Sequence, residues 1–170
     1  MKKIYYNWKQ IEGACIELAR QLQQDNWKPD YIVGITRGGA VPAILLSQYM
    51  GIPMRPLQVS LRDGQGCVSD LGMAEDAYGV DEEAAKNILI VDDINDQGST
   101  ITWIKEDWPS GCFPDDAVWN SVWGNNVRFA VLTHNLASQA DVDYHAWEVN
   151  KAEEDCWLVY PWEDFWHNEN

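Results

Sequence analysis

A chain of 170 residues, of which 46% are hydrophobic, can bury one sizeable core but is short for two full domains. The formal net charge of −15 argues against non-specific nucleic-acid binding, which needs a basic surface. The sequence contains no apolar run of about 18 residues that would span a membrane, and no apolar signal segment follows the first basic residues. We therefore expect a single cytoplasmic domain, residues 1–170, with neither a membrane nor a nucleic-acid partner.

The first third of the chain has the element order of a parallel α/β sheet. Hydrophobic residues recur every three or four positions over residues 8–22, which predicts a helix. The apolar run 31–35 predicts a buried strand, residues 40–49 a second helix, and residues 54–59 a second strand. A strand, a tight turn, a helix and a strand in this order form the βαβ unit of a parallel sheet.

The next segments alternate between polar stretches and clear strands. Residues 61–86 are polar and weakly periodic, which predicts a long mobile lid loop. Residues 87–91 predict the clearest strand of the chain, residues 92–98 a loop, and Ser99 the start of a helix. Further strands are expected at residues 127–133, 143–149 and 157–160.

Residues 106–126 form an irregular insertion in this pattern. The segment holds Trp108, Trp119 and Trp123 among turn residues. Exposed aromatic side chains in such a loop tend to mark an interface, which favours a contact or lid element. The alternative is a loop that packs on its own side chains.

One ten-residue stretch, 91–100, carries the chemistry. An apolar strand runs into the adjacent acids Asp92 and Asp93, a third acid follows at Asp96, and a small-residue turn opens a helix at Ser99. Adjacent carboxylates can hold sugar hydroxyls or a hard cation, and backbone N–H groups at a helix N-terminus bind phosphate. The alternative is an acidic loop with a helix cap at Ser99.

This stretch resembles the phosphoribosyl pyrophosphate (PRPP) motif of type I phosphoribosyltransferases, hydrophobic residues followed by Asp-Asp-x-x-Asp-Thr-Gly-x-Thr. Residues 31–54, with Arg37-Gly38-Gly39, look like the first βαβ unit of bacterial xanthine-guanine phosphoribosyltransferases, and residues 156–163 like their purine-binding end. The resemblance implies an α/β fold with a central, mainly parallel sheet flanked by helices. Residues 134–170 would form a small C-terminal hood over the base.

The resemblance implies a PRPP site built from two segments. Arg37 and Gly38 would contact the pyrophosphate. Asp92 and Asp93 would hold the ribose hydroxyls, with Asp93 also close to Mg²⁺. The 5′-phosphate would be bound by four consecutive residues, Gln97, Gly98, Ser99 and Thr100.

The resemblance also implies a base site and a catalytic group. Asp96, within the PRPP-binding loop, would be the catalytic carboxylate beside the purine N7. Trp157 would stack on the base, and the backbone of Leu158 would read its edge. His134 takes the position of the lysine that recognises the purine oxo group, and Glu163 would stand near a second metal ion.

Four of these side chains have plainer interpretations. Arg37 and Glu163 could be ordinary solvated surface groups, as most charged residues are. Trp157 could pack in the core. His134 could cap a loop and never meet the base.

The implied reaction is Mg²⁺-dependent transfer of the phosphoribosyl group from PRPP to a purine base of the guanine, xanthine and hypoxanthine class, by a homo-oligomer (dimer or tetramer). Three departures from the family pattern keep alternatives open: Gln97 replaces a threonine, His134 a lysine, and the 61–86 segment is acidic. The alternatives are a regulator that binds PRPP or a nucleotide with little turnover, and a transferase for another base such as a pyrimidine.

Overall fold

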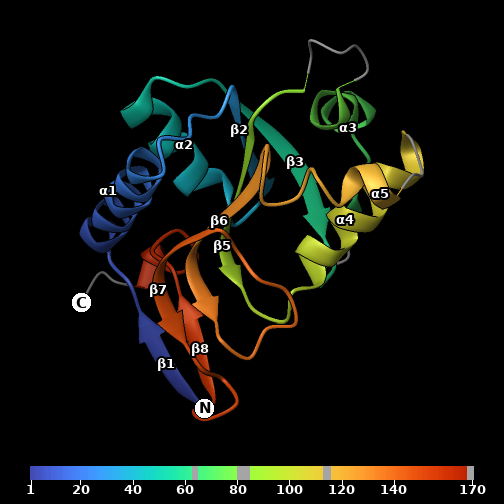
Figure 1. The fold of residues 1–170 in the computed structure, drawn as a ribbon. Coiled ribbons are helices and arrows are strands. Elements are labelled where there is room, and N and C mark those ends of the chain that lie inside the picture. The colour runs from blue at the N-terminus through green and yellow to red at the C-terminus, as the bar shows by residue number, and fades with distance from the viewer. Residues whose placement is uncertain (63–64, 80–84, 113–115, 168–170) are drawn as a thin grey trace.

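A six-stranded sheet forms the centre of the fold (Figure 1). The computed structural model describes residues 1–62, 65–79, 85–112 and 116–167. Five neighbouring strands pair in parallel and β4 pairs antiparallel with β3 at one edge, which confirms the mainly parallel sheet. In spatial order the strands are β4 (Gly66–Cys67), β3 (Met54–Ser60), β2 (Tyr31–Thr36), β5 (Ile88–Asn95), β6 (Val127–Asn135) and β7 (Tyr144–Val149).

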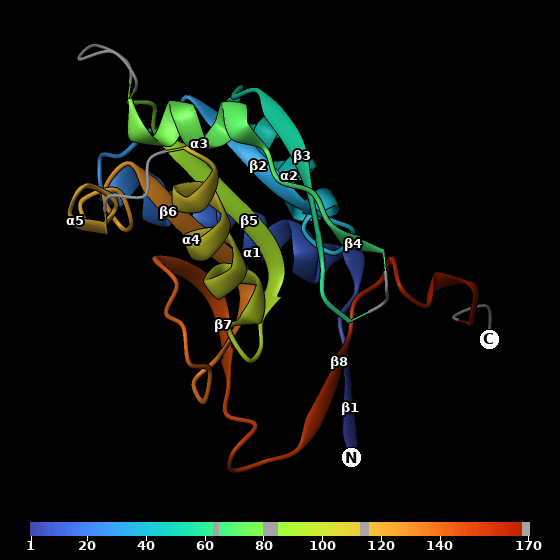
Figure 2. The same ribbon diagram turned by 90° about the vertical axis from the view of Figure 1, so that its right-hand side faces the viewer.

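A second, two-stranded sheet stands apart from the first and brings the two ends of the chain together. Strand β1 (Lys2–Tyr5), which the hydrophobic pattern does not reveal, pairs in parallel with β8 (Cys156–Val159). Figure 2 shows both strands projecting below the main sheet. The predicted C-terminal hood, residues 134–170, is thus divided, because β7 belongs to the central sheet while β8 pairs with an N-terminal strand. We use the name hood for β1, β8 and the connection between β7 and β8.

Helices cover both faces of the central sheet (Figures 1 and 2). Helices α1 (Trp8–Gln24) and α2 (Ala40–Met50) contribute to one buried hydrophobic cluster. Helices α3 (Leu71–Tyr78) and α4 (Ser99–Gly111) contribute to the other, together with the short α5 (Asp116–Trp119). A 3-10 turn, Phe165–His167, follows β8, and no helix in the described ranges is long and apolar enough to cross a membrane.

Local sequence accounts for the start and the buried face of α1. The Asn7 side chain accepts a hydrogen bond from the Gln10 N–H (2.9 Å), and the Gln10 side chain accepts one from the Asn7 N–H (2.8 Å). This reciprocal pair satisfies two of the N–H groups that a helix start leaves unpaired. Ile11, Leu18 and Leu22 are fully buried, so the predicted amphipathic helix is confirmed.

The segment 61–86 is not the continuous loop that its composition predicts. Helix α3 begins with Asp70 as its cap, and its residues Met73, Ala74 and Ala77 are buried in the core. Asp76 ties the helix to the sheet by accepting a hydrogen bond from the Tyr31 hydroxyl at 2.8 Å. Periodicity missed α3 because only eight residues carry it. Residues 63–64 and 80–84, also within the predicted lid, lie outside the described part of the chain.

The segment 106–126 is likewise more regular than expected. Helix α4 continues through Pro109 to Gly111, and Trp108 and Trp119 are only 1% and 2% exposed. The Trp123 ring centroid lies 6.0 Å from that of Trp108 and 5.5 Å from that of Trp119. The prediction of exposed tryptophans at an interface is therefore wrong for Trp108 and Trp119. The alternative, a segment that packs on its own side chains, describes these two residues. Residues 113–115 fall outside the described ranges.

Truncating Trp108 should strongly destabilise the fold. Trp108→Ala is expected to lower the free energy of unfolding by about 3–5 kcal/mol, because it leaves a large cavity. Trp108→Phe should cost clearly less, since the Trp108 Nε1 makes no hydrogen bond to the described residues that phenylalanine would lose. Denaturant titration followed by circular dichroism measures both. Equal stability of Trp108→Ala and the unmodified chain would contradict this packing.

Candidate active site

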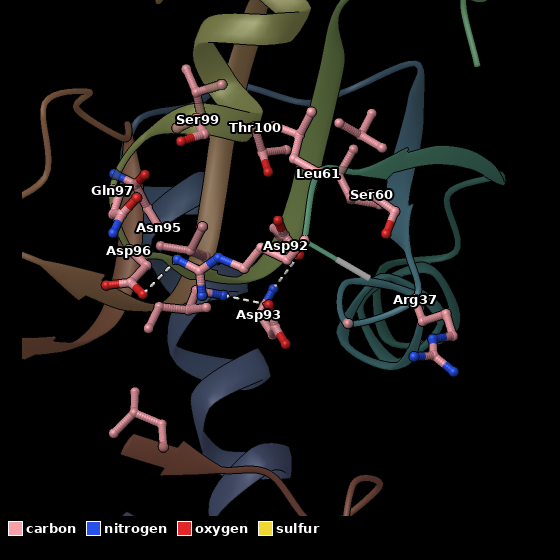
Figure 3. Close-up of a pocket in the computed structure, with 18 of the residues that line it drawn as sticks. Arg37, Ser60, Leu61, Asp92, Asp93, Asn95, Asp96, Gln97, Ser99 and Thr100 are labelled. Atoms are coloured by element: carbon pink, nitrogen blue, oxygen red, sulfur yellow. Dashed lines mark hydrogen bonds and ion pairs between the residues drawn. The ribbon is translucent and has the colours of Figure 1, made fainter. Parts of the chain in front are cut away.

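A cavity of about 930 Å³ opens at the carboxyl ends of β2, β3 and β5. Open parallel sheets bind ligands at this edge. Every site residue predicted from the sequence lines the cavity except His134. Figure 3 shows Asp96, the pair Asp92 and Asp93, and Arg37 spread across it in that order.

Asp92 and Asp93 lie in strand β5 and not in the loop predicted for residues 92–98. Strand β5 continues to Asn95, and Asp92 is paired with Val131 of β6. The pairing partner of this stretch lies far along the chain, so the local sequence gave no sign of it. The backbone of both acids is consequently fixed by the sheet.

The side chains of Asp92 and Asp93, the acid pair of the site, lie next to each other, and the pKa of each is raised. The Asp93 N–H donates to Asp92 Oδ1 (2.9 Å), and the Ile94 N–H donates to Asp93 Oδ1 (2.7 Å). Burial raises the pKa of Asp92 well above its ordinary value, and the neighbouring Asp93 charge raises it further. Burial also raises the pKa of Asp93. Two desolvated carboxyl groups side by side favour binding of protons, hydroxyl donors or a cation.

Two glycines allow the turn after β2 to pass directly against the acid pair. A Cβ atom on Gly38 would overlap the Asp93 carboxylate, and one on Gly39 would overlap the Val91 carbonyl oxygen. Arg37 precedes them with an exposed side chain that lines the cavity, and the Thr36–Arg37 peptide bond is cis. The Arg-Gly-Gly segment thus meets the acidic segment at the cavity.

The turn between β5 and α4 offers a cradle for a phosphate group. Gly98 has a φ of 90°, and a Cβ atom there would also collide with Ala140, so glycine is required on both counts. Ser99 and Thr100 then begin α4, and both residues line the cavity. Gln97, which replaces the family's threonine, is exposed at the same edge. A helix N-terminus of this kind suits an anion.

Glu163 adds a fourth carboxylate at the cavity, besides Asp92, Asp93 and Asp96. Its Oε2 accepts a hydrogen bond from the Tyr160 N–H at 2.8 Å. Desolvation raises the pKa of Glu163, and the charge of Asp93 contributes to the shift. The described residues contain no cluster of three metal-ligating side chains, but Mg²⁺ is normally held by one or two carboxylates plus water and substrate phosphates. Asp93 and Glu163 fit a cation that arrives with a phosphorylated substrate.

Among the described residues, Asp96 forms ion pairs with two cations of the site. Its Oδ2 lies 3.0 Å from Arg62 Nη2 and 3.1 Å from Lys151 Nζ. Burial alone would raise the pKa of Asp96, but the hydrogen bonds and charges of Arg62 and Lys151 outweigh burial and lower it. Lys151 was absent from the residues predicted for the site, because it follows β7 in a stretch without any motif. Only the folding of the hood brings it to the cavity.

The hood supplies an aromatic face. Trp157 is 45% exposed and lines the cavity, so it does not pack in the core. Leu158 follows it in β8 with a buried side chain, and it pairs with Ile4 of β1. The arrangement leaves the Trp157 ring accessible for stacking on a planar ligand.

His134 lies apart from this cavity. The side chain is 8% exposed, its Nδ1 is 3.1 Å from the Asn95 amide nitrogen, and its ring is 5.4 Å from that of His145. Burial lowers the pKa of His134, and the proximity of His145 lowers it further. This placement does not support the expected contact with the base.

The raised carboxyl pKa values predict a pH-dependent stability. The folded chain binds the Asp92 proton more tightly than the unfolded chain does, so the corresponding stability is lost as pH rises above the ordinary carboxyl range near 4. Asp92→Asn removes the buried charge and should raise the melting temperature at pH 7 in EDTA, by about 2–4 °C for each kcal/mol of strain relieved. The gain should shrink toward pH 5. Calorimetry at both pH values, with the exposed Glu153→Gln as control, measures it, and a lower melting temperature for Asp92→Asn would refute the assignment.

Comparison with known proteins gives one consistent family. Residues 1–163 match the phosphoribosyl transferase domain family. The chain is 25% identical to the xanthine-guanine phosphoribosyltransferase of Idiomarina loihiensis (98% of this chain, 90% of the relative) and 28% identical to that of Chromohalobacter salexigens (92% and 82%). The crystal structure of a purine phosphoribosyltransferase from Pyrococcus horikoshii is similar with a TM-score of 0.66 and 27% identity, covering 96% of this chain and 95% of that one.

Proposed function

Because this chain belongs to the phosphoribosyltransferase family, we propose that it transfers the phosphoribosyl group of PRPP to a 6-oxopurine base such as guanine, xanthine or hypoxanthine. The observation that carries the proposal is the joining of three groups in one cavity: the acid pair Asp92 and Asp93, the helix start after Gly98, and the exposed Trp157 ring. They would bind ribose, phosphate and base respectively. The relatives described above carry the names of purine enzymes, which supports the choice of base.

The chain's own residues would position two reactants for one displacement. The bond from the ribose C1 to the pyrophosphate oxygen breaks, and a bond from the purine nitrogen to C1 forms. Asp92 and Asp93 would hold the ribose hydroxyls while Arg37 and Gly38 meet the departing pyrophosphate. Holding both partners in line supplies much of the rate acceleration in such reactions. Asp96 would accept the proton that the purine loses, or stabilise the positive charge that develops on its ring.

A divalent cation belongs to the same proposal. Bound Mg²⁺ would screen the pyrophosphate and ease its departure. Asp93 and Glu163 would hold the ion together with the substrate oxygens, and burial raises the pKa of both carboxyl groups, which favours pairing with a cation. The remaining expectations, a cytoplasmic location and a dimer or tetramer, stay predictions, and mass measurement in solution tests the second.

A panel of bases tests the function directly. Purified protein with PRPP and Mg²⁺ should release pyrophosphate with guanine, xanthine or hypoxanthine, less with adenine, and none with uracil. The expected ranking follows from the relatives, which are named as xanthine-guanine enzymes. Tight PRPP binding without pyrophosphate release from any base would instead favour a regulatory protein.

A further inference from the structure

Lys151 lies in the connection between β7 and β8 and reaches the base end of the cavity. We propose that Lys151 recognises the exocyclic oxygen of the base, so that the cation comes from the hood and not from the end of β6, where His134 stands. The inference rests on the proposed function and names the residue that would set its preference among bases.

The ammonium group of Lys151 lies close to both groups expected to contact the base, Asp96 and Trp157. Its Nζ lies 3.1 Å from Asp96 Oδ2 and 5.8 Å from the centroid of the Trp157 ring. The Lys151 side chain is only 18% exposed, so most of its stem is already ordered. A base stacked on Trp157 with one edge toward Asp96 would therefore meet this ammonium group.

The chemistry of the purine edge matches that spacing. In guanine, the N7 and O6 atoms are neighbouring acceptors on one edge of the ring system. If the Asp96 carboxylate faces N7, a donor held at hydrogen-bond distance from that carboxylate, about 3 Å, lies close to the neighbouring O6 atom. An ammonium group can only donate hydrogen bonds, so it pairs with a 6-oxo group and not with the 6-amino group of adenine.

A buried amide holds Asp96 and Lys151 in this relation. Asn135, 4% exposed, donates from Nδ2 to the backbone oxygen of Asp96 at 2.9 Å. Its Oδ1 accepts a hydrogen bond from the Lys151 backbone N–H at 3.1 Å. Asn135 thus acts as a positioning residue that joins the end of β6 to the hood connection.

Arg62 is a second cation beside Asp96, and comparing it with Lys151 distinguishes neutralising Asp96 from recognising the base. It also contacts Asp96, but its side chain is 60% exposed and extends from the segment after β3. A cation that merely neutralises Asp96 would affect every base alike when removed. A cation that reads the base edge would affect oxo and amino bases differently.

The test compares Lys151→Met with the matched surface variant Lys9→Met, in which the same charge is lost from an exposed position. Calorimetry with GMP and AMP measures the preference without any need for turnover. Lys151→Met should bind GMP about 10- to 100-fold more weakly, as expected for losing a hydrogen bond to a charged group, while AMP affinity changes less than about threefold. Lys9→Met should bind both nucleotides as the unmodified protein does. His134→Gln should also keep the GMP-to-AMP ratio.

Kinetics separate this inference from the proposed function. In Lys151→Met, the KM for guanine should rise while the affinity for Mg²⁺–PRPP stays unchanged. If the unmodified protein turns over guanine but Lys151→Met keeps its GMP-to-AMP ratio, or loses both nucleotides equally, the inference is wrong and the function stands. If no base is turned over, the function fails, and the nucleotide-binding ratios still decide the role of Lys151.

Discussion

Replacing both Asp92 and Asp93 by asparagine is expected to weaken Mg²⁺–PRPP binding by at least about 100-fold. Each carboxylate would accept charge-assisted hydrogen bonds from ribose or hold the cation, and such bonds contribute roughly 1.5–3 kcal/mol each. Two of them together correspond to two or more factors of ten in affinity. Asparagine keeps the side-chain size and the oxygen that accepts the Asp93 N–H, so the end of strand β5 should keep its conformation. Titration calorimetry in Mg²⁺ and in EDTA measures the effect.

The matched control is another pair of adjacent acids, Glu153 and Glu154, which are exposed in the hood connection. Changing both to glutamine removes the same formal charge from a chain of net charge −15. PRPP affinity should then stay within about twofold, because exposed charges are screened. If Asp92→Asn/Asp93→Asn binds PRPP as well as this control does, or if EDTA leaves the affinity of the unmodified protein unchanged, the PRPP assignment fails.

Asp96→Asn should separate chemistry from binding. We expect kcat to fall by about 100- to 1,000-fold, within the range for a lost general acid–base group, while PRPP affinity changes little. The Asp96 carboxylate is the only acid of the motif with a lowered pKa, so it remains charged through neutral pH and is protonated only as pH falls below its ordinary range near 4. Activity that depends on Asp96 should accordingly persist down to about pH 5.

Rapid-mixing kinetics with guanine measure this loss, and Asp155→Asn in the exposed part of the hood serves as the control. Asparagine at position 96 would still accept hydrogen bonds from Arg62 and Lys151, so the geometry of the cations should be kept. A variant with full turnover would remove Asp96 from the chemistry. A variant that also loses PRPP affinity would make Asp96 a binding residue.

The cavity gathers three cations of this acidic chain, but four acids also line it: Asp92, Asp93, Asp96 and Glu163. Arg37, Arg62 and Lys151 all line it, although Lys and Arg together number only 12 against 27 acids. Two of these cations are paired with Asp96 in the absence of substrate. Binding of a polyanion there would therefore depend on an accompanying divalent cation as well as on these side chains.

Contiguous stretches of the sequence were enough to predict the βαβ unit, the parallel sheet and the PRPP motif with its three acids. These features depend on local periodicity, on glycine turns and on residues close together in the chain. The prediction of α1 was confirmed by its cap and buried face for the same reason. The site residues of the motif meet because parallel strands end at one edge of the sheet.

Contacts between distant segments were decided only by the tertiary structure. Lys151 meets Asp96 across 55 residues, and the extension of β5 to Asn95 requires the register with β6. The burial of Trp108 likewise depends on α5 and the strands beneath it, so its local sequence resembled an exposed loop. Packing fixes such contacts through the arrangement of whole elements, and no single stretch of sequence carries the information. For that reason the sequence pointed to His134 as the residue that reads the base, while the fold brings Lys151 to the cavity.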